Sequence, residues 1–239
     1  MVTMQSLSHP GLKRSNNEDV ALTAELAGGY LLLAVADGVG GTRGGEVASA
    51  RAMQSLSDHL EGISIDDPEE ALRDAFMAAN AAVREDAAES LELASMSTTL
   101  VAGLVQDGTA WVANVGDSRA YLIDNDEAQP LTIDHSWVGE QIRNGTVAPD
   151  DPLVARFSNI VTRVVGAHEE LEVDVFGPIE LADGCALLFC SDGLHGPVAD
   201  ESIAGAFAEA EGEVANRLIQ LAIDAGGPDN VSVAVLDTR

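Results

Sequence analysis

Residues 20–38 read VALTAELAGGYLLLAVADG, two apolar segments on either side of a glycine pair. Strand-forming residues dominate both segments, and the glycines between them let the backbone turn tightly. The pattern predicts a β-hairpin with strands at Val20–Leu26 and Tyr30–Ala36. Asp37 directly follows the second strand, and the turn brings it opposite Asp19, which directly precedes the first.

The rest of the chain alternates between blocks of strand pattern and blocks of helical pattern. Helices are predicted at Glu46–Leu60, residues 68–90, Ser136–Asn144, Glu201–Ala208 and Glu213–Ala225. Strands are predicted at Val2–Ser8, Ser97–Val105, Thr109–Val115, Ser118–Ile123, Leu171–Phe176, Ala186–Cys190 and Val231–Leu236. Short turn sequences separate the three strands between residues 97 and 123, which indicates an antiparallel meander. The order predicts an α+β fold in which antiparallel sheets pack together and helices cover their outer faces.

Size and composition favour one domain. The chain has 239 residues, 46% of them hydrophobic, which suffices for a large single core. No apolar run approaches the roughly 20 residues that span a bilayer, and the N-terminus lacks the pattern of a signal peptide. We therefore expect a soluble, cytoplasmic protein that forms a single domain over residues 1–239.

The net charge is strongly acidic, at −28, with 40 acidic residues against 12 lysines and arginines. Such a surface repels nucleic acid and anionic membranes, so neither is expected as a partner. A solvated acidic surface that keeps the protein in solution explains this charge, and adaptation to high intracellular salt is the alternative. The dependence of activity on KCl concentration separates the two.

Four aspartates carry the chemical signal, because each adjoins a small or turn-forming residue at the end of an apolar strand pattern: Asp19, Asp37, Asp192 and Asp229. Carboxylates that converge from separate strand ends suit hard divalent cations, which prefer oxygen ligands. Metal-dependent phosphoester chemistry is the hypothesis that follows. A structural or cation-binding protein whose aspartates only decorate a surface would spread its charges evenly instead.

Eight short motifs follow one another along the whole chain. They are Gly11-x-x-Arg14-x-x-Asn17-Glu18-Asp19, Ala36-Asp37-Gly38-x-Gly40-Gly41, Ser97-Thr98-Thr99, Val115-Gly116-Asp117-Ser118-Arg119, Asp134-His135-Ser136, Thr162-Arg163-x-x-Gly166, Ser191-Asp192-Gly193-Leu194 and Asp229-Asn230. In this order they resemble the metal-dependent protein phosphatases, the type 2C serine/threonine phosphatases, in their bacterial form. The resemblance implies a four-layer αββα sandwich, with two antiparallel sheets face to face between helix pairs. It also implies one catalytic domain over residues 1–239, with a flap at about 136–160.

The resemblance further implies a two-metal site that uses Mn²⁺ or Mg²⁺. By this correspondence Asp37 bridges both ions, Asp192 and Asp229 hold one, and the carbonyl of Gly38 holds the other. Asp19 is then a direct or water-mediated partner of that second ion. Ions of this kind keep several waters and use few carboxylates, so such a ligand set is sufficient.

Two further residues correspond to functional positions of the family. Arg14 resembles the arginine that binds the substrate phosphate, and a guanidinium can clamp two phosphate oxygens. Asp117 resembles the ligand of a third metal that is shared with Asp192, and a turn aspartate that caps a hairpin is the structural alternative. Arg119 is expected to form a structural ion pair.

One residue departs from the pattern of many eukaryotic members, which carry a histidine where this chain has Val39. The proton for the leaving group must then come from another source. A metal-bound water is the first candidate, and His135 or His195 is a weaker one.

The implied activity is hydrolysis of phosphoserine and phosphothreonine by in-line attack of a metal-bridging water or hydroxide. The expected partners are phosphoproteins and a bacterial serine/threonine kinase whose action the enzyme reverses, and the expected state is a monomer. A pseudophosphatase that binds phosphoproteins without hydrolysis is one alternative. Phosphotyrosine, phosphohistidine or a small phosphorylated metabolite as the substrate is another.

Overall fold

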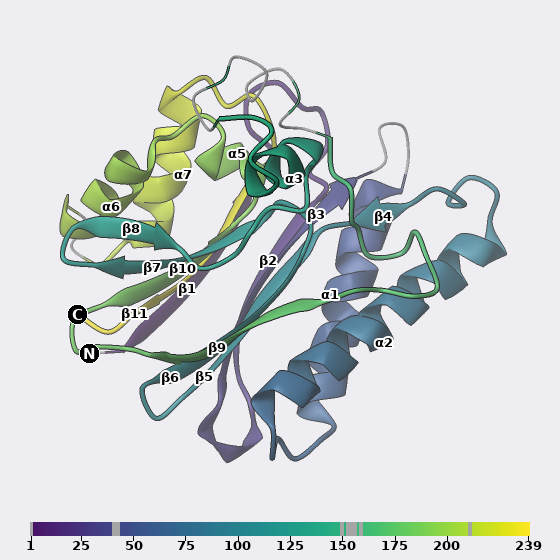
Figure 1. Cartoon of the computed structure of the whole chain (residues 1–239), viewed down its shortest axis with the longest axis horizontal. Helices are drawn as coiled ribbons and strands as arrows, with labels where there is room; N and C mark the ends of the chain where they lie inside the picture. Colours follow the sequence, from purple (N-terminus) through teal and green to yellow (C-terminus); the bar gives the residue numbers. More distant parts are fainter. Residues whose placement is uncertain (1, 40–43, 149–150, 152–156, 158–159, 210–211) are drawn as a thin grey trace.

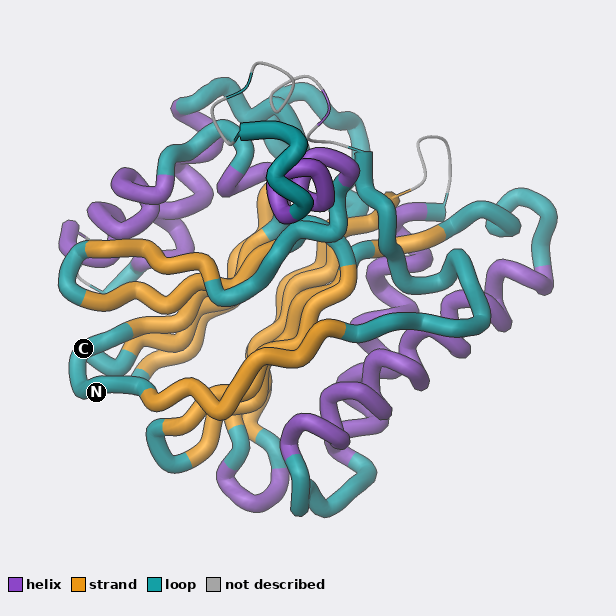
Figure 2. Tube along the Cα trace, viewed as in Figure 1, coloured by secondary structure: helices purple, strands orange, loops and turns teal. Residues whose placement is uncertain are grey.

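The computed structural model of the chain describes residues 2–39, 44–148, 151, 157, 160–209 and 212–239. Two antiparallel sheets pack against each other, and helices cover the outer face of each (Figures 1 and 2). The α+β class and the four-layer αββα order predicted from the sequence are therefore confirmed.

Within the described residues, the first sheet has five strands in the order β1-β11-β10-β7-β8. Their bounds are β1 Thr3–His9, β11 Val231–Asp237, β10 Ala186–Cys190, β7 Arg119–Asp124 and β8 Glu127–Pro130. The second sheet runs β2-β3-β5-β6-β9, with β4 paired to β3. Their bounds are β2 Asp19–Glu25, β3 Leu31–Val39, β4 Ser97–Thr98, β5 Leu100–Gln106, β6 Thr109–Val115 and β9 Asp174–Glu180.

Helices cover both outer faces. The second sheet is covered by α1 (Gly45–Glu61) and α2 (Pro68–Glu89), and the first by α5 (Asp192–His195), α6 (Asp200–Glu209) and α7 (Val214–Asp224). A further helix, α3 (Trp137–Arg143), lies at one end of the sandwich, and a 3-10 helix, η1 (Ala27–Gly29), closes the β2–β3 hairpin (Figure 1). The predicted flap at about 136–160 contains α3, and part of it lies outside the described residues.

Strand alternation divides the hydrophobic core into three layers, because successive side chains point to opposite faces of a sheet. On β3, Leu32 and Ala34 pack towards α1 and α2, whereas Leu33 and Val35 pack between the sheets. Phe189 of β10 lies in the same middle layer. Each sheet thus buries both faces, which explains why its central strands are almost entirely apolar.

The predicted antiparallel meander is wrong at its third strand. β5 pairs with β6 as expected, but β7 leaves that sheet and pairs with β10 in the other one. Alternation shows that a segment is a strand with two buried faces, but it does not specify which sheet accepts it. The crossing carries Asp117, which separates β6 from β7, to the junction of the two sheets.

Other differences are local. β9 begins at Asp174 rather than at Leu171 and contains a Gly177–Pro178 bond, an interruption that its position at the edge of the sheet tolerates. The short elements β8 and α5 were not predicted. No helix in the described part of the chain is long and apolar enough to cross a membrane.

Candidate active site

A cavity of about 530 Å³ lies where β3, the start of α5 and the start of β11 meet. Six of the seven predicted site residues line it: Arg14, Asp37, Gly38, Asp117, Asp192 and Asp229. The seventh, Asp19, does not. The fold thus gathers side chains that lie up to about two hundred residues apart in the sequence, as the motifs predicted.

Asp37 is held at the end of β3 through its backbone. Its N–H donates to Thr99 Oγ1 (3.1 Å), and its carbonyl accepts from the Thr99 N–H (2.8 Å) and from Thr98 Oγ1 (2.8 Å). Enclosure by protein, followed by the charge of Asp19, raises the pKa of the Asp37 carboxyl well above its usual range. These bonds fix the backbone of Asp37, and its carboxyl group lines the cavity.

Asp19 lies opposite Asp37 in the β2–β3 register, and it is only 6% exposed. Its Oδ2 accepts from Ser191 Oγ (2.7 Å), whereas its Oδ1 has no hydrogen-bond partner among the described residues. Burial raises the pKa of Asp19 to about 7. Asp19 is therefore buried behind the cavity lining, and it links β2 to Ser191, the residue that follows β10.

Asp192 is the first residue of α5, and only Ser191 separates it from the end of β10. The next residue must be glycine, because a Cβ at Gly193 would collide with the carbonyl of Asn230. This close approach holds the Asp192 turn against the turn that carries Asp229. Burial, followed by the charge of Asp229, raises the pKa of Asp192 to about 6.

Arg14 and Asp229 form an ion pair at the rim, with 2.7 Å between Nη2 and Oδ2. The Arg14 side chain is 56% exposed, so it can leave this partner at little cost. Asn230 secures the loop that carries Arg14: its Nδ2 donates to the carbonyls of Pro10 (3.0 Å) and Asn16 (2.8 Å). The guanidinium is exposed, and hydrogen bonds hold the loop that carries it.

Asp117 also lines the cavity, and burial raises its pKa to about 7. Its carbonyl lies 3.0 Å from Nε2 of His195, and burial lowers the pKa of that histidine to about 4. Arg119 pairs with Asp134 through two hydrogen bonds, Nε to Oδ1 (2.8 Å) and Nη2 to Oδ2 (2.7 Å). The expectation of a structural ion pair at Arg119 is met.

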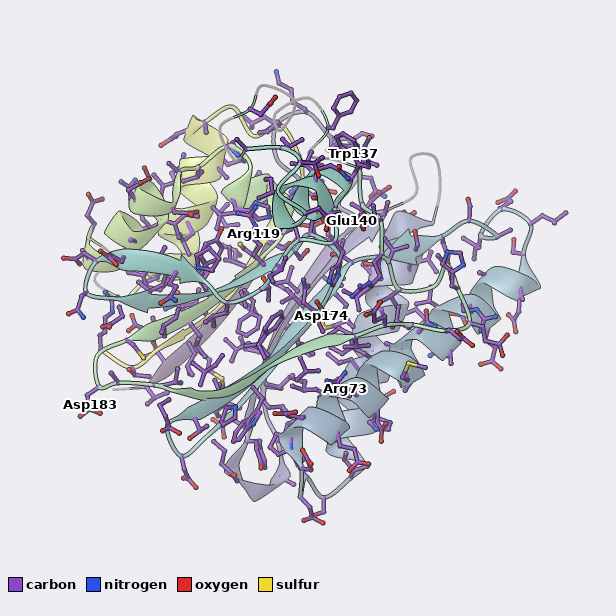
Figure 3. The ribbon with its side chains drawn as sticks, in the orientation of Figure 1. Arg73, Arg119, Trp137, Glu140, Asp174 and Asp183 are labelled. Carbon is purple, nitrogen blue, oxygen red and sulfur yellow. The ribbon has the colours of Figure 1, made fainter. Side chains whose placement is uncertain are left out.

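His135 is 2% exposed and makes structural contacts with the turn after β6 and with the edge strand β9. Its Nδ1 accepts from the Gly116 N–H (3.0 Å), and its Nε2 lies 3.1 Å from Oδ2 of Asp174. Asp174 and Arg119, both labelled in Figure 3, come from different sheets. Neither His135 nor His195 lines the cavity, which leaves both without access to a leaving group there.

Sequence reasoning missed two carboxylates that line the cavity, Glu18 and Glu46. Glu18 precedes β2, and its backbone N–H donates to Asn230 Oδ1 (2.9 Å). Burial, followed by the charge of Glu46 from the first turn of α1, raises the pKa of Glu18. The signal was in the Asn17-Glu18-Asp19 motif, because neighbouring residues at a strand end face opposite ways and Asp19 faces inward.

The chemistry of the cavity suits divalent cations. Several carboxylates share one cavity, and among the described residues of its lining Arg14 is the only basic side chain. A buried oxygen of Asp19 also lacks a partner in the described structure. Like charges at this density favour either protons or metal ions. Among the described residues, however, no three carboxylates or imidazoles already surround one ion position. The carboxylates share a cavity, but their side chains are not arranged as a coordination shell.

Comparison with known proteins agrees with the motifs. Residues 12–220 match the family model described as Protein phosphatase 2C. The chain belongs to this family. It is 34% identical over 234 residues to the serine/threonine phosphatase stp of Listeria monocytogenes, covering 95% of this chain and 92% of that protein.

Solved structures of this phosphatase family superpose over nearly the whole chain. The serine/threonine phosphatase PstP/Ppp of Mycobacterium tuberculosis matches with a TM-score of 0.88 and 35% identity, over 100% of this chain and 99% of that one. The catalytic domain of PstP in complex with two manganese ions matches with a TM-score of 0.84 and 35% identity, over 99% and 97% of the two chains. The resemblance inferred from the motifs is confirmed, and the protein phosphatase 2C family is metal-dependent.

Proposed function

We propose that the chain is a metal-dependent protein serine/threonine phosphatase whose catalytic domain is the single domain of residues 1–239. One observation carries the proposal: carboxylates from four separate segments, Asp37, Asp117, Asp192 and Asp229, line one cavity with a guanidinium at its rim. Membership of the protein phosphatase 2C family and the activity for which its relatives are named support it.

The proposed ligand set for two Mn²⁺ or Mg²⁺ ions is Asp37 between them, Asp192 and Asp229 on one side, and the Gly38 carbonyl on the other. Asp117, which also lines the cavity, is the proposed ligand for a third ion. Asp19 supports the second ion from behind Asp37, and Glu18 offers a further oxygen in the cavity itself. Such ions, when bound, lower the pKa of a water nucleophile and neutralise the oxygens of the phosphoryl group.

The residues of the chain bind and orient the substrate. Arg14 is proposed to leave Asp229 and to bind two oxygens of the substrate phosphate instead. Because its side chain is exposed, breaking this ion pair costs little free energy. The exchange also frees Asp229 to act as a ligand. Asn230 keeps the Arg14 loop in place during this movement through its bonds to Pro10 and Asn16.

The proposed substrates are phosphoserine and phosphothreonine in proteins that a bacterial serine/threonine kinase has modified. The net charge of −28 disfavours nucleic acids as partners. We further propose that the enzyme acts as a monomer in the cytoplasm. Phosphotyrosine, phosphohistidine and small phosphorylated metabolites are the competing substrates, because the cavity residues would recognise the phosphoryl group of each.

The test is release of phosphate from a panel of peptides that carry phosphoserine, phosphothreonine or phosphotyrosine, with Mn²⁺ and with EDTA. Asp37→Ala and Asp192→Ala serve as controls for the cavity. Hydrolysis of phosphoserine and phosphothreonine peptides that needs Mn²⁺ and is lost in both variants supports the proposal. Equal rates in the parent and the variants would refute it, and binding of phosphopeptides without hydrolysis by the parent would indicate a pseudophosphatase.

A further inference from the structure

A polar side chain lies buried on the packing face of α2. Asn80 is 1% exposed among the buried alanines and Val83 of this helix. Its Oδ1 accepts from the N–H of Gly166 (2.7 Å), and its Nδ2 donates to the carbonyls of His168 (2.9 Å) and Glu169 (3.4 Å). A buried amide without partners would cost free energy, so these bonds account for its presence in the core.

All three bonds go to the backbone of one loop, which leads from the Thr162-Arg163 motif into β9. The same face of α2 makes a second contact two turns earlier, where Arg73 Nη1 donates to the carbonyl of Val173 (2.8 Å). Figure 1 shows this segment passing over α1 and α2 before it enters β9, and Figure 3 labels Arg73 beside it. The loop is thus fastened to the helix at both ends.

The loop and the helix are in close contact at Gly166. This residue has a φ of +99°, and a Cβ there would collide with the side chain of Val83 on α2. Val83 lies three residues after Asn80, on the same side of the helix. This contact leaves no space between the loop and α2. The hydrogen bonds of the Asn80 amide therefore determine the position of the loop backbone on the helix.

From this loop a short chain of hydrogen bonds leads to Asp37. Val165 pairs with Thr98 in both directions, with N···O distances of 3.0 and 2.8 Å. Thr98 Oγ1 donates to the carbonyl of Asp37 (2.8 Å), whose other partner is the Thr99 N–H (2.8 Å). The path has three steps: Asn80 to the loop, Val165 to Thr98, and Thr98 to Asp37.

We propose that Asn80 is a positioning residue for the metal site, which it serves by holding the 165–169 loop so that Thr98 supports the backbone of Asp37. The inference rests on the proposed role of Asp37 as a metal ligand. Without the amide, the Gly166 N–H is left unpaired in the core and the loop shifts to find another acceptor. Thr98 then moves with Val165, and the backbone that carries the Asp37 carboxyl group is no longer held in one position.

The test compares Asn80→Ala with Leu72→Ala. Leu72 is fully buried on the same helix and belongs to the core of α1 and α2, so its truncation destabilises α2 and leaves the hydrogen bonds to the loop intact. Mn²⁺ binding is measured by isothermal titration calorimetry on folded protein at 25 °C, and stability by thermal unfolding in EDTA. Supporting-shell changes at metal sites cost about 10-fold in affinity, and we expect a loss of that order in Asn80→Ala and none in Leu72→Ala.

Two further variants make the result specific. Asn80→Ser is milder and serves if the alanine variant does not fold; it should weaken Mn²⁺ binding in the same direction. Thr98→Val removes the hydroxyl that reaches Asp37 and keeps the shape of the side chain. Because Asn80 and Thr98 act in series, the double variant Asn80→Ser/Thr98→Val should lose less Mn²⁺ affinity than the sum of the single losses.

The inference is overturned if the Asn80 variants unfold at lower temperature but bind Mn²⁺ as tightly as the parent, or if Leu72→Ala weakens binding equally. Additive losses in the double variant would also overturn it. Asp37→Asn distinguishes this outcome from failure of the proposed function. If Asp37→Asn binds Mn²⁺ like the parent, the two-metal proposal itself falls, whereas a loss confined to Asp37→Asn removes only the role of Asn80.

Discussion

Asp19 and Asp37 are direct partners in the β2–β3 register, so two carboxyl groups share the same end of one hairpin. Like charges directly opposite each other destabilise a strand pair. Protein enclosure raises the pKa of both groups, that of Asp19 to about 7. In the absence of a cation, protonation of these carboxyl groups relieves the repulsion between them. The stability of the metal-free protein should therefore depend on pH.

We predict that the metal-free protein becomes less stable as the pH rises through the range of about 4 to 7. An aspartate in the unfolded chain releases its proton near pH 4, whereas Asp19 and Asp117 hold theirs to about pH 7 and Asp192 to about pH 6. The folded state then binds more protons, so its stability falls as the pH increases. Thermal unfolding in EDTA at about pH 5 and about pH 8 measures the fall, and Mn²⁺ should reduce it.

The control for this pH dependence is Asp19→Asn, which removes one of the titrating groups and should give a shallower decline. His195 acts in the opposite direction, because its pKa is lowered to about 4 and the unfolded chain takes up this proton first as the pH falls. The contribution of His195 is the same in parent and variant, so it cancels when their pH dependences are compared. Identical slopes in the two proteins would contradict the prediction.

The strands and long helices could be predicted because both faces of each sheet are covered. β10 was predicted without error at Ala186–Cys190, since five consecutive apolar residues in a short run fit a strand buried on both sides. β7 was assigned to the wrong sheet, because the partner of a strand depends on the packing of distant segments. β9 was misplaced because Gly177 and Pro178 interrupt its pattern at a sheet edge.

The gathering of the motif residues in one cavity was predictable from the sequence, whereas the arrangement of side chains within the cavity was not. The motif Asn17-Glu18-Asp19 contains one carboxylate that lines the cavity and one that is buried behind it, and the direction of the strand end decides which is which. The pairing of Arg14 with Asp229 also could not be predicted, because it joins residues 215 positions apart. Such contacts depend on the assembled sheets rather than on any local pattern.

Glu18→Gln should weaken Mn²⁺ binding more than Asp19→Asn does. Glu18 lines the cavity directly, and Asp19 acts through its position behind Asp37. Loss of a charged oxygen from the cavity removes Coulomb attraction for the ions, whereas the change at Asp19 alters mainly its bond with Ser191. Calorimetric Mn²⁺ titration measures both. Glu25→Gln, at the exposed far end of β2, is the control that should bind like the parent.

Arg14→Ala should lower kcat/KM for phosphopeptides by about 100-fold, the effect of removing a donor to the transferred group. Arg14 contacts the proposed metal ligands through its ion pair with Asp229, and the substitution leaves the Asp229 carboxylate in place. The Mn²⁺ affinity should therefore be maintained. Arg14→Lys keeps the charge but not the two-pronged donor, and we expect it to recover little of the loss. Steady-state kinetics at saturating Mn²⁺ tests this, and an unchanged kcat/KM in Arg14→Ala would remove Arg14 from the site.

Asn230→Ala should destabilise the protein by about 2 kcal/mol, since it leaves buried backbone groups without partners. Asn230 is 5% exposed and accepts from the Glu18 N–H while it donates to Pro10 and Asn16. The released loop carries Arg14, so KM should rise as well. Thermal unfolding and steady-state kinetics provide the two measurements, with Asn216→Ala on an exposed part of α7 as the control. A fall in stability with unchanged KM would show that this loop does not position Arg14.

The charge of −28 predicts a stability that increases with ionic strength. Mutual repulsion among carboxylates opposes the compact state, and salt screens it over about 10 Å at about 0.1 M. Thermal unfolding in EDTA should therefore shift upward as KCl is raised from about 0.05 to about 1 M. If the acidic surface serves only to keep the protein in solution, Mn²⁺-dependent hydrolysis of p-nitrophenyl phosphate persists in dilute buffer. Loss of that activity at low KCl, with recovery at high KCl, would instead identify a protein adapted to a salt-rich interior.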